Sequence, residues 1–205
     1  MSKVVRVHEH GGPEVLRIEE LDVGQPGAGE VRLRIEAIGL NRSEAAFRSG
    51  LYPVKPKLPT LIGYEASGII EALGAGVEDF AVGDRVCVLP TFRLGEYGVY
   101  ADRAIVPARS ILPAPAALSP TQAASIWMQY LTALAIIEVA HATVGDHVII
   151  RAASSSVGLA AIQLASWAGA VPIAATRRGT KSQAPARAGR EARHRDGRKR
   201  PRRRG

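Results

Sequence analysis

The sequence predicts a mixed fold: a barrel-like β domain, then one βαβ unit, then a disordered basic tail. Three observations support this prediction. Residues 1–117 contain many short apolar segments separated by Gly and Pro turns, which is typical of a β barrel. Residues 118–183 contain a strand, a helix and a second strand. Residues 184–205 contain nine Arg and no large apolar side chain, so burial there cannot offset the entropy cost of ordering.

The clearest strand of the β domain covers residues 30–39, where apolar residues alternate with charged ones and define one buried face. A short helix is expected next, because Asn41 or Ser43 can cap its start and Gly50 can end it. The remaining strands of this domain are expected at residues 3–7, 15–21, 61–72, 85–89 and 97–104, and near Ile111.

The apolar spacing changes after residue 118. Ser119 and Pro120 predict a helix start, with serine as the cap and proline at the first helical position, followed by a run over residues 121–140. The βαβ unit is then expected as a strand at 147–151, a helix at 158–167 and a strand at 171–175.

The turn between the first strand and the helix of this unit consists of small residues. Such a turn lets the backbone approach a diphosphate, and the free N–H groups of the helix start favour an anion. The alternative is a tight strand–helix turn with no ligand, since only one glycine of the usual glycine-rich pattern is present. The candidate cofactor-binding residues are Ser154, Ser155, Ser156, Val157 and Gly158.

The second strand of the unit is followed by basic residues. An NAD-binding unit usually has an acidic residue here, on the ribose 2′-hydroxyl. This sequence has Arg177, Arg178 and Lys181 instead, which favours the 2′-phosphate of NADPH. The alternative is that these are solvated charges in a loop.

The segment GYEASGIIEALG at residues 63–74, followed by GDRV at 83–86, resembles the signature of the medium-chain dehydrogenase/reductase superfamily. It is most similar to the zinc-free quinone oxidoreductases. Further motifs appear in the family's order over residues 39–44, 48–53 and 152–163. The resemblance implies a GroES-like β barrel at 1–117 and a partial Rossmann NADP-binding domain at 118–183, with the active site in the cleft between them.

The resemblance also implies the chemistry and its residues. Intact relatives would transfer a hydride from NADPH to a quinone or an α,β-unsaturated carbonyl. Asn41 and Tyr52 match residues that line the quinone pocket and could hydrogen-bond a developing oxyanion, and Thr132 matches a threonine near the nicotinamide. Each residue has a structural alternative: a helix cap for Asn41, packing for Tyr52 and a helix-interior hydroxyl for Thr132.

No catalytic or structural zinc is expected. Zinc-dependent relatives have a cysteine in place of Asn41 and a histidine in place of Tyr64, and a zinc site needs about three such ligands. Cys87 is the only cysteine of the chain, which excludes a four-cysteine zinc lobe and a disulfide framework.

Charge is distributed unevenly along the chain. Residues 1–176 carry 14 basic and 17 acidic residues, a net charge of −3, whereas residues 177–205 carry 13 basic and 2 acidic residues, a net charge of +11. We therefore expect no specific nucleic-acid partner, although the tail would bind nucleic acid non-specifically. Without a secretory signal or an apolar run long enough to span a membrane, a cytoplasmic protein with no membrane partner is expected.

The family's pattern continues well beyond the motifs found here. We expect a C-terminally truncated, weakly active or inactive reductase whose tail arises from a frameshift near residues 183–185, because its Arg, Ala, Gly and Pro are encoded by GC-rich codons. Intact relatives are expected to form homo-oligomers. Two alternatives remain: an alcohol dehydrogenase-like enzyme acting on a carbonyl or alcohol, and a basic-tailed binding protein without catalysis.

Overall fold

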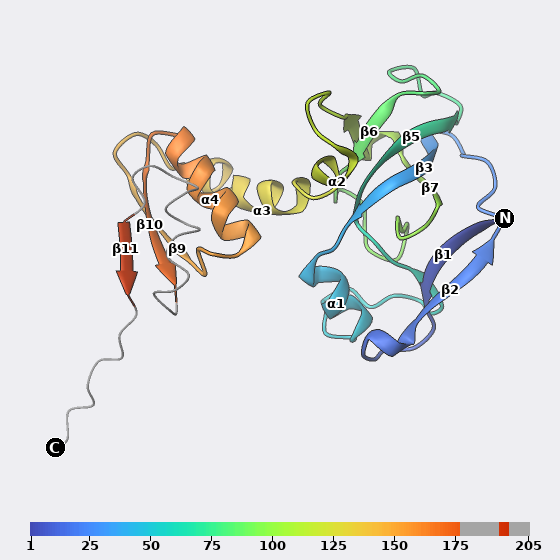
Figure 1. Ribbon diagram of the computed structural model, residues 1–205, viewed down its shortest axis with the longest axis horizontal. Coiled ribbons are helices and arrows are strands. Elements are labelled where there is room, and N and C mark those ends of the chain that lie inside the picture. Colours follow the sequence, from blue (N-terminus) through green and yellow to red (C-terminus); the bar gives the residue numbers. More distant parts are fainter. Residues whose placement is uncertain (177–192, 197–205) are drawn as a thin grey trace. The chain divides into compact units, whose positions relative to one another are not determined.

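The computed structural model describes residues 1–176 and 193–196, and the chain divides into two compact units. The first unit is Met1–Met128 and the second begins at Gln129. Figure 1 shows that strands make up most of the first unit, whereas helices and a small sheet make up the second. The mixed fold predicted from the sequence is therefore confirmed.

The first unit contains a five-stranded antiparallel sheet in the order β7-β3-β5-β6-β8. Its central strands pair over most of their length, with register shifts that mark β-bulges between β3 and β5. Its strands are β3 (Glu30–Gly39), β5 (Glu65–Leu73), β6 (Arg85–Val88), β7 (Arg103–Pro107) and β8 (Ile111–Pro113).

A second sheet of the same unit has the order β2-β1-β4. Its strands are β1 (Ser2–Val7), β2 (Leu16–Leu21) and β4 (Thr60–Leu61), and a 3₁₀ turn at Pro13–Val15 precedes β2. A hydrogen bond from Val5 N to Tyr100 O, 2.7 Å long, links this sheet to the segment before β7.

Apolar side chains from both sheets and from α1 (Arg42–Arg48) form one core. On β3, Val31 and Leu33 are buried while Arg34 and Glu36 are exposed, which confirms the predicted alternation. Phe47 on α1 is also fully buried in this core. The buried side chains of β3 and Phe47 of α1 share one core, so β3 and α1 are held together. This packing places the polar residues that lie at the end of the strand.

Three elements differ from the sequence prediction. The strand expected at 61–72 is interrupted at residues 62–64. Gly63 in this break has φ +106°, and a Cβ on it would lie 2.3 Å from the Tyr100 ring. The strand expected at 97–104 forms later, as β7. The helix expected over 121–140 is two helices, α2 (Pro120–Ala123) and α3 (Trp127–Glu138).

The second unit contains the predicted βαβ unit. Strands β9 (His147–Arg151) and β10 (Val171–Thr176) are parallel, and α4 (Ser156–Trp167) connects them. Small side chains of α4 pack against both strands. The sheet order is β11-β10-β9, so within the described residues β9 has a neighbour on one side only.

Strand β11 (Arg193–Asp196) was not expected. Its backbone pairs in parallel with β10, from Ile173 opposite Arg193 to Thr176 opposite Asp196. The sequence predicts disorder over residues 184–205, and apart from these four residues that segment lies outside the described part of the chain.

Candidate active site

A buried carboxyl group, that of Glu65 at the start of β5, lies at the centre of the polar cluster in the first unit. Its side chain is 1% exposed. Oε1 accepts hydrogen bonds from the backbone N–H of Trp127 (2.5 Å) and of Met128 (3.3 Å), and Oε2 accepts one from Asn41 Nδ2 (3.2 Å). Burial raises the pKa of Glu65 and these donors oppose the rise. Glu65 therefore caps the start of α3 from a strand 62 residues earlier in the chain.

Asn41 occupies the N-cap position of α1 but its side chain makes no capping hydrogen bond. The amide instead donates to Glu65, and the residue is half-buried. The alternative that Asn41 is a helix cap is therefore wrong for its side chain. Its backbone, with φ −125° and ψ 156°, is extended as expected at an N-cap.

A second buried carboxyl group, Glu44 on α1, lies in the same cluster and is 3% exposed. Its Oε2 accepts from Ser43 Oγ at 2.8 Å, whereas Oε1 is buried without a hydrogen-bond partner. Burial raises the pKa of Glu44, and the charge of Glu65 contributes in the same direction. The hydrogen bond from Ser43 partly opposes that rise.

Three tyrosines and two phenylalanines form aromatic contacts in this unit. Tyr52 packs edge-to-face on Phe47, with ring centroids 6.2 Å apart, and Tyr64 packs edge-to-face on Phe92 at 5.1 Å. Burial raises the pKa of Tyr64, with smaller contributions in the same direction from Tyr52 and Glu44. Tyr52 is half-buried and contributes to packing, and its phenol remains a candidate hydrogen-bond donor to a ligand.

Thr132 lies on α3 in the second unit, where its side chain is exposed and the next residue, Ala133, is buried. The structure thus places the three candidate catalytic residues on different elements: Asn41 before α1, Tyr52 after it, and Thr132 on α3. It joins Asn41 to Glu65, a partner that the sequence did not indicate.

The serine-rich turn leads directly from β9 into α4. Ser155 is the N-cap, and its Oγ accepts from the Gly158 backbone N–H at 3.1 Å. Ala152 has φ +50°, a left-handed conformation that is uncommon for alanine. A Cβ on Gly158 would lie 2.7 Å from Ala152 O and from Ala153 Cα, so only glycine fits here.

The remaining residues of this turn leave the helix start accessible. Ser155 and Ser156 are exposed, Ser154 and Val157 are half-buried, and Gly158 is buried against the turn. The N-terminus of this 12-residue helix has the backbone geometry that accommodates an anion. The candidate 2′-phosphate partners, Arg177, Arg178 and Lys181, lie outside the described residues.

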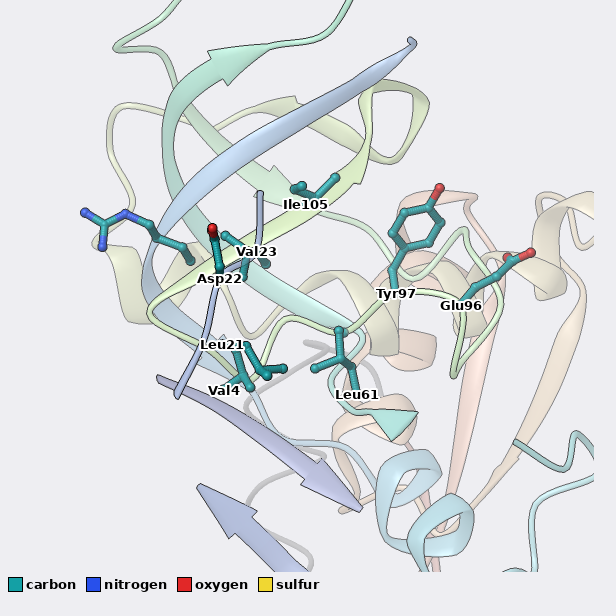
Figure 2. A pocket seen from close by; sticks show the side chains of 11 residues that line it. Val4, Leu21, Asp22, Val23, Leu61, Glu96, Tyr97 and Ile105 are labelled. Carbon is teal, nitrogen blue, oxygen red and sulfur yellow. The ribbon is translucent and has the colours of Figure 1, made fainter. Parts of the chain in front are cut away.

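A cavity of about 260 Å³ lies elsewhere in the first unit. In Figure 2, Val4 and Leu21 lie at one side of it, and Tyr97 and Glu96 come from a loop at another. The Tyr97 hydroxyl already donates to Glu30 at 2.8 Å. None of the candidate catalytic or cofactor-binding residues lines this cavity.

Within residues 1–176 and 193–196, no three His, Cys, Asp or Glu side chains gather as a metal site would require. In that part of the chain, no helix is long and apolar enough to cross a membrane. Cys87 is buried on β6, and burial raises the pKa of its thiol.

Comparison with known proteins gives consistent matches. Residues 27–116 match the family described as the alcohol dehydrogenase GroES-like domain. The chain is 38% identical over 167 residues to a quinone oxidoreductase of Rattus norvegicus, an alignment that covers 80% of this chain and 50% of that protein. It is 35% identical over 172 residues to a 2-haloacrylate reductase of a Burkholderia species, covering 82% and 50%.

Among solved structures, the quinone oxidoreductase of Escherichia coli in complex with NADPH matches with a TM-score of 0.85 and 33% identity. That match covers 97% of this chain and 59% of the other. The chain thus spans about half the length of the curated relatives it matches.

Sequence reasoning missed the role of Glu65 and the unpaired oxygen of Glu44. One signal was available: Glu65 precedes a run of small and apolar residues in a strand, and a carboxyl group in such a run must be buried with partners. The identity of those partners could not be read from the sequence, because two of them are backbone groups of α3.

Proposed function

We propose that this chain, a homologue of the quinone oxidoreductases of the medium-chain dehydrogenase/reductase superfamily, binds NADPH for a hydride transfer to a small conjugated carbonyl compound, a reaction that intact relatives perform and that this chain performs weakly or not at all. The observation that carries the proposal is the turn from β9 into α4. Its small side chains, its exposed serines and the close packing of Gly158 fit the diphosphate of a dinucleotide.

The backbone N–H groups of Ser156 and Val157, at the first positions of α4, would hold the diphosphate. Ser155 caps the helix and so keeps these groups directed along its axis. Arg177, Arg178 and Lys181 would pair with the 2′-phosphate, since guanidinium and ammonium groups bind phosphate strongly. The NADPH complex of the Escherichia coli relative supports this choice of cofactor.

NADPH supplies the hydride when bound. The residues of the chain would then orient the acceptor and stabilise the charge that develops on its oxygen. Asn41 and Tyr52 are the proposed orienting groups, and the Tyr52 hydroxyl can donate a hydrogen bond to the developing oxyanion. Thr132 is the proposed contact to the nicotinamide ring.

The names of the relatives indicate a substrate class. A quinone and a 2-haloacrylate share an electron-poor carbon–carbon double bond conjugated with a carbonyl group. We therefore propose quinones and α,β-unsaturated carbonyls as substrates rather than simple alcohols. In the cluster described here, the Asn41 amide nitrogen faces Glu65 as a hydrogen-bond donor, and such a nitrogen is a poor metal ligand.

The test is NADPH binding, measured by cofactor fluorescence, on the chain as it exists and on a Ser155→Asp variant. Aspartate also caps helices well, so the variant keeps α4 folded but places a carboxylate beside the proposed diphosphate site. We expect the dissociation constant for NADPH to rise by about tenfold or more, equivalent to about 1.4 kcal/mol of charge repulsion. The Ser155→Asn variant is the matched control and should bind as the wild type does.

Equal NADPH affinity in Ser155→Asp and Ser155→Asn would overturn the assignment of the cofactor site. Reduction of 1,4-benzoquinone and 2-cyclohexenone with NADPH tests the substrate class. Stoichiometric zinc in the purified protein, together with oxidation of simple alcohols, would instead support an alcohol dehydrogenase-like enzyme.

A further inference from the structure

The cavity of the first unit lies between its two sheets and is lined mainly by apolar side chains. Its volume of about 260 Å³ exceeds the roughly 150 Å³ of an apolar cavity that binds benzene. One aromatic ring therefore fits inside it. The apolar lining residues come from β1, from the end of β2 and the residues after it, from β4 and from β7: Val4, Leu21, Val23, Leu61, Ala104 and Ile105.

Backbone hydrogen bonds hold the walls of this cavity in place. Strand β4 pairs with β1, and β7 pairs with β3. The loop that carries Tyr97 is held close to β4, because Tyr100 N–H donates to Ile62 O at 3.0 Å. A Cβ on Gly98 in this loop would lie 2.5 Å from Leu61 Cβ, so glycine permits the close approach. A preformed apolar cavity with a few polar groups is typical of a small-molecule site.

The charged residues at the cavity are not equally paired. Arg103 is the basic residue of the lining, and its Nε donates to Glu71 Oε2 at 2.8 Å, so a carboxylate already balances its charge. Glu96 is exposed, and among the described residues its carboxylate has no hydrogen-bond or ion-pair partner. Figure 2 shows Glu96 next to Tyr97, on the side of the cavity away from Asp22. This side therefore offers an unpaired negative charge beside an apolar space.

The hydrogen bond of Tyr97 makes the same side more acidic. The Tyr97 hydroxyl donates to Glu30 Oε1 at 2.8 Å, which places a second carboxylate close to the tyrosine ring. An anionic group of a ligand would be repelled by Glu96 and Glu30, whereas an ammonium group would be attracted by both. The charge at this side thus favours a cation.

We propose that this cavity binds a small apolar amine, with its apolar body between the two sheets and its ammonium group at Glu96 and Tyr97. The site is separate from the proposed cofactor and substrate residues, because none of them lines the cavity. Burial of the apolar body provides most of the affinity. The ion pair with an exposed carboxylate such as that of Glu96 adds a smaller amount, which gives the preference for an amine over a neutral compound.

The first experiment locates the site by NMR, on the full chain with ¹³C-labelled methyl groups of Ile, Leu and Val. Benzylamine should shift the signals of Leu61 and Ile105 in a saturable way, with a dissociation constant of about 1 mM, as expected for so small a ligand. The signals of Leu40 and Leu51 are the internal control, since both residues are exposed and neither lines the cavity. Unchanged signals of Leu61 and Ile105, or equal shifts of Leu40 and Leu51, would overturn the proposal.

The second experiment tests the position of the ammonium group, by comparison of benzylamine with the neutral benzyl alcohol at low ionic strength. The wild type should prefer benzylamine by about threefold, the effect of one exposed ion pair. Glu96→Gln should bind the two compounds equally, and its exposed position lets the variant fold normally. Glu78→Gln is the matched control: Glu78 is also exposed but does not line the cavity, so this variant should keep the preference. Absence of the preference in the wild type, or its persistence in Glu96→Gln, would contradict the proposed ion pair.

Discussion

Helices α3 and α4 begin in different ways, although both start after a short turn. At α4 the cap is local: Ser155 precedes the helix directly and accepts from Gly158 N–H, three residues further on. At α3 the cap is remote: the carboxylate of Glu65, on a strand of the β unit, accepts from Trp127 and Met128. A local cap depends on the neighbouring sequence, whereas a remote cap depends on the completed fold.

Removal of the remote cap should have the largest effect. In Glu65→Ala, two backbone N–H groups and the Asn41 amide lose their acceptor in a site that is 1% exposed in the wild type. Buried donors without partners cost free energy, so we expect a loss of about 3 kcal/mol in stability. Trp127 fluorescence during urea unfolding, in a Trp167→Phe background, measures it. A loss below that of Ser155→Ala would show that the remote cap is the weaker one.

The start of α4 has a local constraint of its own, and Gly158→Ala tests it. Alanine favours helices by up to about 1 kcal/mol over glycine. However, its Cβ would lie 2.7 Å from the backbone of Ala152 and Ala153, so we expect a net loss of about 2 kcal/mol. Hydrogen exchange of the α4 backbone amides should be faster in Gly158→Ala than in the wild type. The exposed Ser166→Ala on the same helix is the control and should change little.

The same contrast explains how much of the structure could be predicted. The serine turn before α4 and the start of α2 at Ser119 and Pro120 were predicted from the residues, and each lies within two positions of the observed helix start. The break between α2 and α3 was not predicted, because an apolar run over 121–140 gives no local reason to stop. It forms where Glu65 accepts the N–H groups of a second helix start.

The candidate site divides in the same manner. Asn41 was identified from a motif, and its N-cap position was also predicted, but its hydrogen bond to Glu65 depends on the approach of two strand ends. The sequence did not indicate that Glu44 is buried, because an acidic residue in the first turn of a helix is usually solvated and stabilises the helix. Only packing shows that its Oε1 is buried without a partner.

Removal of the local cap should have a smaller effect than either change above. In Ser155→Ala, the Gly158 N–H loses its partner, but the residue is exposed and water can replace the serine oxygen. We expect a loss of about 1 kcal/mol. Urea unfolding followed by Trp167 fluorescence, in a Trp127→Phe background, measures the loss. A loss equal to that of Glu65→Ala would remove the distinction between the two helix starts.

The last effect, no larger than that of Ser155→Ala, is expected at Glu44, the carboxyl group beside Asn41 that caps no helix. Burial raises its pKa above the ordinary value of 4.5, so the folded state favours the protonated form. The contribution of Glu44 to stability is therefore complete below pH 4.5 and is lost as the pH rises through the folded-state pKa.

Glutamine cannot ionise, so Glu44→Gln should be more stable than the wild type at pH 8, by about 1 kcal/mol, and no more stable at pH 4. Thermal unfolding at the two pH values measures this difference. Glu9→Gln, at an exposed position with no ion pair to a described residue, is the matched control. A Glu44→Gln variant that is less stable at pH 8 would mean that the ionised carboxylate is held by donors, as that of Glu65 is.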